Sequence, residues 1–292
     1  MTEPGRVSVL IPSRNEQFLA PTVRDVLAKA AGDVEIIVHL DGYWDHGLPD
    51  DPRVVLIHRG TSAGMRQGIN AAAACARGGY LMKLDAHCMV AEGFDEVLKA
   101  ECEPNWVVVP RRKSLDAEAW TVAKGRPSID YHYLSWPYVD PKEPGLHGRW
   151  WRERQEARKD EQLDEEMSSQ GSGWFTTREH WNRLGGLTEE GYGTFIQEFQ
   201  EIGCRTWLGG GAVMVNKRTW YAHLHKGKRY GRGYTGSPRA WRRGRIFSAD
   251  YWLNNRWPER VHDFDWLIER FWPVPTWPED WRQHDHSRIA DA

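Results

Sequence analysis

The first 110 residues alternate short apolar segments with segments of helical periodicity, and this alternation limits the folds open to the chain. The apolar segments have the length and composition of buried strands, and the segments between them carry apolar residues three or four positions apart. The predicted strands are residues 7–11, 34–40, 54–57, 80–84 and 106–109, and the predicted helices are residues 18–31, 65–77 and 93–101. Because strands joined through helices form crossover connections, we expect an α/β fold with a mainly parallel sheet flanked by helices.

Asp85 and His87 directly follow the predicted strand at residues 80–84. Residues i and i+2 of a strand point to the same side, so these two side chains should project together. A carboxylate oxygen beside an imidazole nitrogen suits a divalent metal such as Mn²⁺. The structural alternative is an aspartate that caps a turn beside a packed histidine. Asp41 and residues 12–16 also follow predicted strands, and ligands bind beyond the carboxyl ends of such strands, which favours a functional site.

Composition excludes several broad classes of protein. The 292 residues carry a net charge of -2, so no global field attracts the chain to nucleic acid or to membranes. The four cysteines form no CxxC pair, which indicates reduced thiols. The N-terminus has no apolar signal region and no stretch approaches 18 apolar residues, so we expect a cytoplasmic protein that does not contact membranes.

Several motifs resemble those of one enzyme family. Residues 9–16 (VLIPSRNE) resemble the opening of the family 2-type glycosyltransferases of the nucleotide-diphospho-sugar (GT-A) fold. Gly64 and the alanine-rich helix that runs into residues 84–88 (LDAHC) are most similar to the polypeptide N-acetylgalactosaminyltransferases, whose DxH replaces the commoner DxD metal motif. The similarity continues in patches through residues 171–175, 184–187 and 198–207.

The resemblance implies a metal-dependent glycosyltransferase that uses a nucleotide-sugar donor, and a UDP-sugar is the expected donor. Asp41 matches the family carboxylate that hydrogen-bonds the uracil ring, although an Asp-Gly turn is the alternative. The residues expected at the donor are Pro12, Ser13, Arg14, Glu16, Asp41, Gly64, Arg66, Lys226, Lys228 and Arg229.

The same resemblance implies a Mn²⁺ (or Mg²⁺) site with three protein ligands. Asp85 and His87 are two of them. His223, in the segment after a predicted strand at residues 212–215, is the expected third, and His225 is the fallback. A cation that bridges the two phosphates of the donor would stabilise the negative charge of the leaving group.

Glu198 resembles the family carboxylate beside the acceptor, and Glu201 is the second choice. An inverting enzyme needs such a group as a general base, whereas a retaining enzyme would use it to hold substrate. The family motif Trp-Gly-Gly-Glu-Asn is replaced here by TFIQEF at residues 194–199. The sequence decides neither the identity of the donor sugar nor the stereochemistry of transfer. The alternative is a solvated face of an amphipathic helix.

Residues 217–245 contain ten Lys or Arg and no Asp or Glu, with five aromatic residues interleaved. The first part is expected to form a lid over the diphosphate. Ten cations exceed what two phosphates need, so we expect a polyanionic acceptor, such as a hydroxylated base in DNA. A protein Ser or Thr or a glycan is the alternative acceptor, and a cationic surface that matches the acidic residues 160–166 is the structural alternative. The GxGxxG at residues 231–236 lies in this loop and is discounted as a dinucleotide site.

We expect residues 1–245 to form the GT-A catalytic domain. Residues 1–113 would bind the nucleotide, and residues 114–245 would shape the acceptor site and complete the metal site. Residues 246–292, which are rich in tryptophan, would form an extension packed on this domain. Two more distant interpretations are a nucleotidyltransferase, which normally shows a Gly-rich, Lys-containing N-terminal loop, and an inactive module that binds sugar or nucleic acid.

Overall fold

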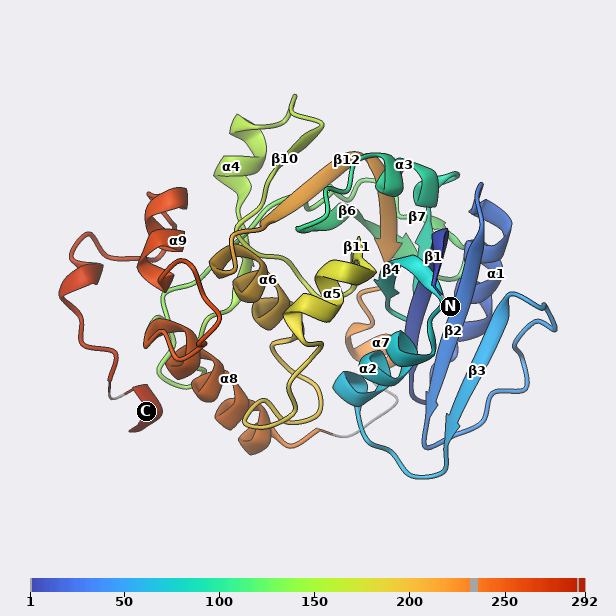
Figure 1. Cartoon of the computed structure of the whole chain (residues 1–292), viewed down its shortest axis with the longest axis horizontal. Coiled ribbons are helices and arrows are strands. Elements are labelled where there is room, and N and C mark those ends of the chain that lie inside the picture. The colour runs from blue at the N-terminus through green and yellow to red at the C-terminus, as the bar shows by residue number, and fades with distance from the viewer. Residues whose placement is uncertain (1, 232–235, 288, 292) are drawn as a thin grey trace.

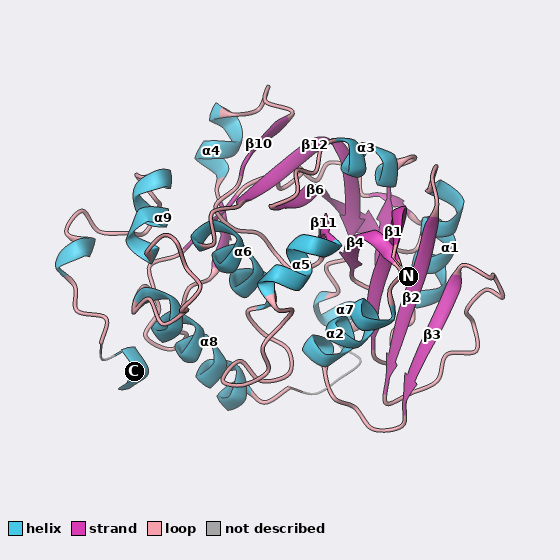
Figure 2. Ribbon diagram, in the orientation of Figure 1, coloured by secondary structure: helices cyan, strands magenta, loops and turns pink. Residues whose placement is uncertain are grey.

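A ten-stranded mixed sheet runs through the molecule, with helices on both faces (Figures 1 and 2). The computed structural model describes residues 2–231, 236–287 and 289–291. Along its main path the sheet has the strand order β10-β12-β6-β11-β4-β1-β2-β3, with β5 paired to β12 and β7 paired to β6. The predicted α/β fold class is confirmed.

The N-terminal half contains the strands and helices expected from the alternation. Four neighbouring parallel strands are β1 (Glu3–Ser13), β2 (Val34–Asp41), β3 (Val54–Arg59) and β4 (Gly78–Leu84). Helices α1 (Leu19–Lys29) and α2 (Met65–Cys75) cover opposite faces. Alternate residues of one strand therefore enter different cores: Val9 packs in the cluster that contains Val23 of α1, whereas Leu10 packs in the cluster that contains Ile69 of α2.

The second half makes the sheet mixed rather than parallel throughout. β11 (Gly173–Thr177) lies antiparallel between β4 and β6 (Trp106–Asp116). β12 (Ala212–His223) runs parallel to β6, and its end pairs antiparallel with β5 (Cys88–Val90). In this last pairing His223 lies opposite Cys88, which brings the end of β12 next to the segment that follows β4.

The remaining elements are short or peripheral to the sheet. The helices are α3 (Phe94–Ala100), α4 (Arg152–Ala157), α5 (Arg178–Leu184), α6 (Glu198–Leu208), α7 (Gly227–Tyr230), α8 (Pro238–Leu253) and α9 (Phe264–Phe271), with 3₁₀ turns at Trp281–Gln283 and Ile289–Asp291. The short strands are β7 (Thr121–Val122), β8 (His132–Leu134), β9 (Gly148–Trp150) and β10 (Leu163–Glu165).

The tryptophan-rich C-terminal segment shares a core with the sheet. Trp252, Trp277 and Trp281 are buried in the same cluster as Val213 of β12. In Figure 1, α8 and α9 lie at the end of the molecule opposite β3. The predicted division after residue 245 falls inside α8, which is continuous from Pro238 to Leu253. The division into a catalytic domain and a C-terminal extension remains a prediction.

None of the helices formed by the described residues combines the length and the apolar character that a membrane span requires.

Candidate functional site

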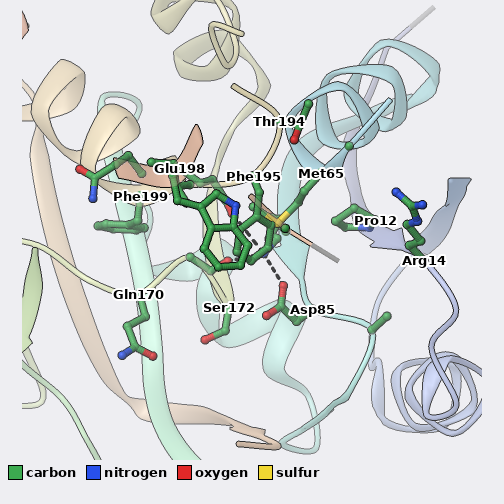
Figure 3. A pocket seen from close by; sticks show the side chains of 18 of the residues that line it. Pro12, Arg14, Met65, Asp85, Gln170, Ser172, Thr194, Phe195, Glu198 and Phe199 are labelled. Atoms are coloured by element: carbon green, nitrogen blue, oxygen red, sulfur yellow. Dashed lines mark hydrogen bonds and ion pairs between the residues drawn. The ribbon is translucent and has the colours of Figure 1, made fainter. Parts of the chain in front are cut away.

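A cavity of about 1040 Å³ opens at the carboxyl ends of β1, β2 and β4 and beside the end of β12. Its lining includes Pro12 near the end of β1, Asp41 at the end of β2, Asp85 after β4 and His223 at the end of β12. Figure 3 shows Asp85 between two groups of side chains, with Pro12 and Arg14 on one side and Gln170 and Phe199 on the other. The cavity thus has two sides with Asp85 between them.

Asp85, His87 and His223 form a cluster at this boundary. One ligand atom from each lies within 4.8 Å of the other two. The Nε2 of His223 is 3.2 Å from Asp85 Oδ2, and the Nε2 of His87 is 3.9 Å from the same oxygen. His225 also lines the cavity, but among the described residues it does not belong to this cluster. The pairing of β12 with β5 therefore brings together the three side chains that the sequence predicted as metal ligands.

The charge states of the cluster suit a cation. Burial lowers the pKa of His223 to about 4, so its imidazole is neutral at neutral pH. Although burial opposes ionisation, Lys83 and His223 hold the pKa of Asp85 well below its ordinary value. Among the described residues, no group forms a hydrogen bond of good geometry with the buried Nε2 of His223, although Asp85 Oδ2 is 3.2 Å away. Two imidazole nitrogens and one carboxylate oxygen are an appropriate ligand set for Mn²⁺ or Mg²⁺, which would take oxygen ligands at further positions.

Glu16 lies beside this cluster and contacts one of its members. Its Oε2 is 3.1 Å from Nδ1 of His87 and also accepts a hydrogen bond from the Lys226 ammonium. Burial opposes ionisation of Glu16, but His87 and Lys226 lower its pKa below the ordinary value. Both Glu16 and Lys226, which the sequence assigned to donor binding, line the cavity.

Lys83 is a buried cation under the site that the sequence reasoning missed. Its Nζ is 2.5 Å from Asp85 Oδ1 and 3.4 Å from Glu198 Oε2, and it donates to the carbonyl oxygen of Gly171. Although burial opposes the charge, the two carboxylates raise the pKa of Lys83. A lysine two residues before Asp85 in an apolar run was the available signal, because both side chains must point to the same face of β4.

Glu198 is at the start of α6, where the sequence placed it, and lines the cavity. Its Oε1 accepts a 2.7 Å hydrogen bond from Nε1 of Trp174, and only 4% of the residue is exposed. Burial raises the pKa of Glu198 although Lys83 opposes the shift.

Asp41 organises the loop that forms the wall of the cavity near Pro12. Its carboxylate accepts hydrogen bonds from the Ser62 hydroxyl and from the backbone N–H groups of Ala63 and Gly64. Burial raises the pKa of Asp41, and these three donors more than offset that effect. Gly64 has a φ of +94°, and a Cβ at this position would lie 2.4 Å from Cβ of Thr194, so glycine is required. Ser62, which also contacts Arg14, was not identified from the sequence.

Arg66 and Glu201 are not among the described residues that line the cavity. Both side chains are fully buried and form a 2.5 Å ion pair with each other. Arg66 also stacks 4.2 Å from the ring centroid of Tyr192. This arrangement ties α2 to α6 and indicates a structural pair. Lys228 and Arg229, expected at the donor, also lie outside the lining, and Arg229 pairs with Glu118.

Several cations of the basic stretch at residues 217–245 pair with acidic residues elsewhere in the chain, so part of its charge is compensated outside the stretch. These pairs are Arg218 with Glu101, Lys226 with Glu16, Arg229 with Glu118, and Arg245 with Glu143. The acidic residues 160–166 are not these partners: Asp164 pairs with Arg154 and Arg158, and Glu165 pairs with Arg270. Arg232, Tyr234 and the centre of the GxGxxG sequence lie outside the described residues.

Phe195, Phe199 and Trp241 form one part of the cavity lining, called the aromatic side from here on. The sequence did not identify this part as a unit. Phe195 and Trp241 line it with ring centroids 5.9 Å apart, and Phe199 and Arg245 also contribute. Trp241 and Arg245 come from α8, so a helix that lies on both sides of the predicted domain division completes this wall.

Comparisons with known proteins agree with this architecture. Residues 8–162 match the family model described as glycosyl transferase family 2. No curated protein matches the sequence significantly. Among solved structures, the chain is similar to GalNAc-T7 with UDP, GalNAc and Mn²⁺, at 19% identity and a TM-score of 0.67, over 91% of this chain and 56% of that one. The chain thus spans little more than half the length of that structure.

Similarity extends to a second glycosyltransferase structure. Residues 1–349 of S. aureus TarS in complex with UDP-GlcNAc match at 14% identity and a TM-score of 0.58, over 90% of this chain and 70% of that one. At these identities the likeness establishes the fold, and it confirms the predicted GT-A fold.

The burial of Lys83 between two carboxylates leads to a stability prediction. Lys83→Met should lower the free energy of unfolding by about 3 kcal/mol, because it leaves Asp85 and Glu198 close together without their shared cation. Urea unfolding followed by circular dichroism measures this change. Lys159→Met is the control, since Lys159 pairs with Glu156 on the exposed surface, and it should change stability little. Equal effects of the two substitutions would show that Lys83 does not hold the carboxylates together.

Proposed function

The chain belongs to glycosyl transferase family 2, and from that premise we propose that it transfers a sugar from a UDP-sugar to a hydroxyl acceptor with Mn²⁺ or Mg²⁺ bound at Asp85, His87 and His223. The observation that carries the proposal is the convergence of these three side chains at the boundary between the two sides of one cavity. The structures of GalNAc-T7 and TarS that share the fold contain UDP or UDP-GlcNAc, and that of GalNAc-T7 contains Mn²⁺.

The three ligands fit a cation that also binds a diphosphate. Nε2 of His223 and Oδ2 of Asp85, with His87, would hold the ion, and the donor phosphates and water could supply oxygen ligands. When bound, the cation supplies Lewis-acid stabilisation of the leaving diphosphate. Lys226, which lines the cavity near the cluster, is the side chain placed to add a second positive charge.

The donor nucleoside is assigned to the Pro12 side of the cavity. Pro12, Ser13, Arg14 and the loop held by Asp41 form this wall. One oxygen of Asp41 accepts from Ala63 and the other from Ser62 and Gly64, so Asp41 shapes the nucleoside site through its loop as well as through any contact with the base.

Glu198 is assigned to holding the acceptor side of the site. Its low exposure and its bonds to Trp174 and Lys83 favour a holding role over proton abstraction from the acceptor hydroxyl. NMR analysis of the product anomer distinguishes a retaining from an inverting reaction.

The acceptor assigned to the aromatic side is a hydroxylated base in a polyanion such as DNA. Phe195 and Trp241 offer ring faces on which a flat base can stack. Arg239 and Arg243 are exposed on the first half of α8, the helix that carries Trp241, where they can contact phosphates. A protein hydroxyl is the alternative acceptor, supported by the shared fold with GalNAc-T7.

Binding of UDP should depend on the metal. Isothermal titration calorimetry of UDP with Mn²⁺ present should give an affinity at least about tenfold higher than with EDTA, because the cation bridges protein and diphosphate. Asp85→Ala should remove most of this difference. Equal UDP affinity with and without metal would contradict the mechanism.

His223 and His225 provide a direct comparison of two neighbouring histidines. His223→Ala should raise the Mn²⁺ concentration needed for half-maximal activity by about tenfold, as expected when a metal site loses part of its coordination. The melting temperature of the metal-free protein should stay within about 3 °C of the wild type, because Asp85 keeps its ion pair with Lys83 when His223 is removed. His225→Ala should leave the Mn²⁺ requirement unchanged. The reverse result would move the third ligand to His225.

Binding to DNA that bears hydroxymethylated pyrimidines should weaken with salt. Each phosphate contact should steepen the fall of log affinity with log salt by about 0.7 to 0.9. Arg239→Ala combined with Arg243→Ala should flatten the slope, and fluorescence anisotropy at several salt concentrations measures it. Lys124→Ala combined with Lys159→Ala is the charge-matched control, because both lysines are exposed and lie outside the cavity lining. Transfer to peptides without salt-sensitive binding to nucleic acid would rule out the polyanionic acceptor and support a protein hydroxyl.

A further inference from the structure

Glu16 makes two contacts that belong to different parts of the proposed reaction. The same oxygen, Oε2, lies 3.1 Å from Nδ1 of His87 and accepts a hydrogen bond from the Lys226 ammonium. Its other oxygen, Oε1, accepts from the backbone N–H of Phe18, 3.2 Å away. Only 5% of the Glu16 side chain is exposed, so water cannot easily replace these partners.

The contact with His87 fixes which ring nitrogen carries the proton. When Nδ1 donates to Glu16, Nε2 of the neutral ring carries a lone pair, and Nε2 is the atom that lies 3.9 Å from Oδ2 of Asp85. A carboxylate that accepts from the outer nitrogen of a ligating histidine orients the ring and raises its basicity. Glu16 therefore favours binding of a cation at His87.

The contact with Lys226 acts in the opposite direction. Lys226 follows the end of β12 and lines the cavity, where its ammonium could pair with a phosphate oxygen. In the structure this ammonium is held by Glu16. A diphosphate must therefore compete with a partly buried carboxylate for the same cation.

We propose that Glu16 is a positioning residue with opposite effects on the two ligands of the site: it strengthens metal binding through His87 and weakens metal-free diphosphate binding through Lys226. This inference rests on the proposed function and adds a coupling within the same site. When a diphosphate draws Lys226 away, Oε2 of Glu16 is left to His87 alone, so binding of the diphosphate strengthens the orientation of the metal ligand. By linkage, the metal then strengthens binding of the diphosphate by the same factor.

Glu16→Gln tests the coupling with little change in shape. The amide oxygen can still accept from Phe18, but the negative charge that holds His87 and Lys226 is gone. Mn²⁺ binding without nucleotide, measured by electron paramagnetic resonance, should weaken about tenfold. UDP binding in EDTA, measured by ligand-observed NMR at millimolar UDP, should strengthen by about threefold, because the Lys226 end of the ion pair is partly exposed and its release costs little.

Two further variants separate the two contacts. Lys226→Met should strengthen Mn²⁺ binding, because Oε2 of Glu16 is then left to His87 alone, and should weaken UDP binding in EDTA. In the double variant with Glu16→Gln, the loss of Mn²⁺ affinity should persist and the gain in UDP affinity should disappear. Glu118→Gln is the matched control, because Glu118 pairs with Arg229 of the same segment and has no contact with the metal ligands, so Mn²⁺ affinity should not change.

Opposite changes in the two affinities distinguish positioning from a general structural role, which would weaken both. If Glu16→Gln weakens both ligands, or leaves Mn²⁺ affinity unchanged while the wild type binds UDP and Mn²⁺, the inference is overturned and the proposed function stands. If the wild type binds neither UDP nor Mn²⁺, the proposed function fails, and the inference fails with it.

Discussion

The antiparallel pairing of β5 with the end of β12 is the constraint on which the site depends. It places His223 opposite Cys88, three residues beyond Asp85, and so joins two segments that are more than 130 residues apart in the chain. A shift of one residue in this pairing would turn His223 to the other face of the strand, because strand side chains alternate. The parallel pairing of β12 with β6 supports the same register from the other side.

Charge compensation beneath the site follows from this geometry. Asp85, just after β4, and the buried Glu198 of α6 both lie within 3.4 Å of the Lys83 ammonium, so one cation compensates two carboxylates. Lys83 supplies it from inside the sheet, which leaves Oδ2 of Asp85 facing the two histidines. Glu16 is similarly shared between two groups, because its Oε2 contacts both Nδ1 of His87 and the Lys226 ammonium. The site is therefore a set of carboxylates that are each held by a named cation or hydrogen-bond donor.

The sequence predicted the elements that follow local periodicity, together with the residues that stand directly at strand ends. Strand and helix alternation fixed the N-terminal half, and Asp85 and His87 are neighbours along the chain, so their proximity needed no knowledge of the fold. The antiparallel insertion of β11 was not foreseen, because its partners β4 and β6 lie far from it in sequence. The same limit applies to Arg66 and Glu201: the sequence assigned both to the site, but only the fold shows that they form an ion pair with each other in the core. The partners of the basic stretch, such as Glu101 and Glu143, come from segments that no local pattern connects to it.

The central claim is that Asp85, His87 and His223 hold one divalent cation between the nucleoside side and the aromatic side of the cavity. Anomalous diffraction from crystals grown with UDP and Mn²⁺, collected at the manganese absorption edge, tests it most directly. The account predicts an anomalous peak within about 2.5 Å of Oδ2 of Asp85 and of Nε2 of both histidines, with the diphosphate of UDP completing the coordination. Bound UDP with no manganese peak at these three atoms, or with the peak elsewhere, would contradict it.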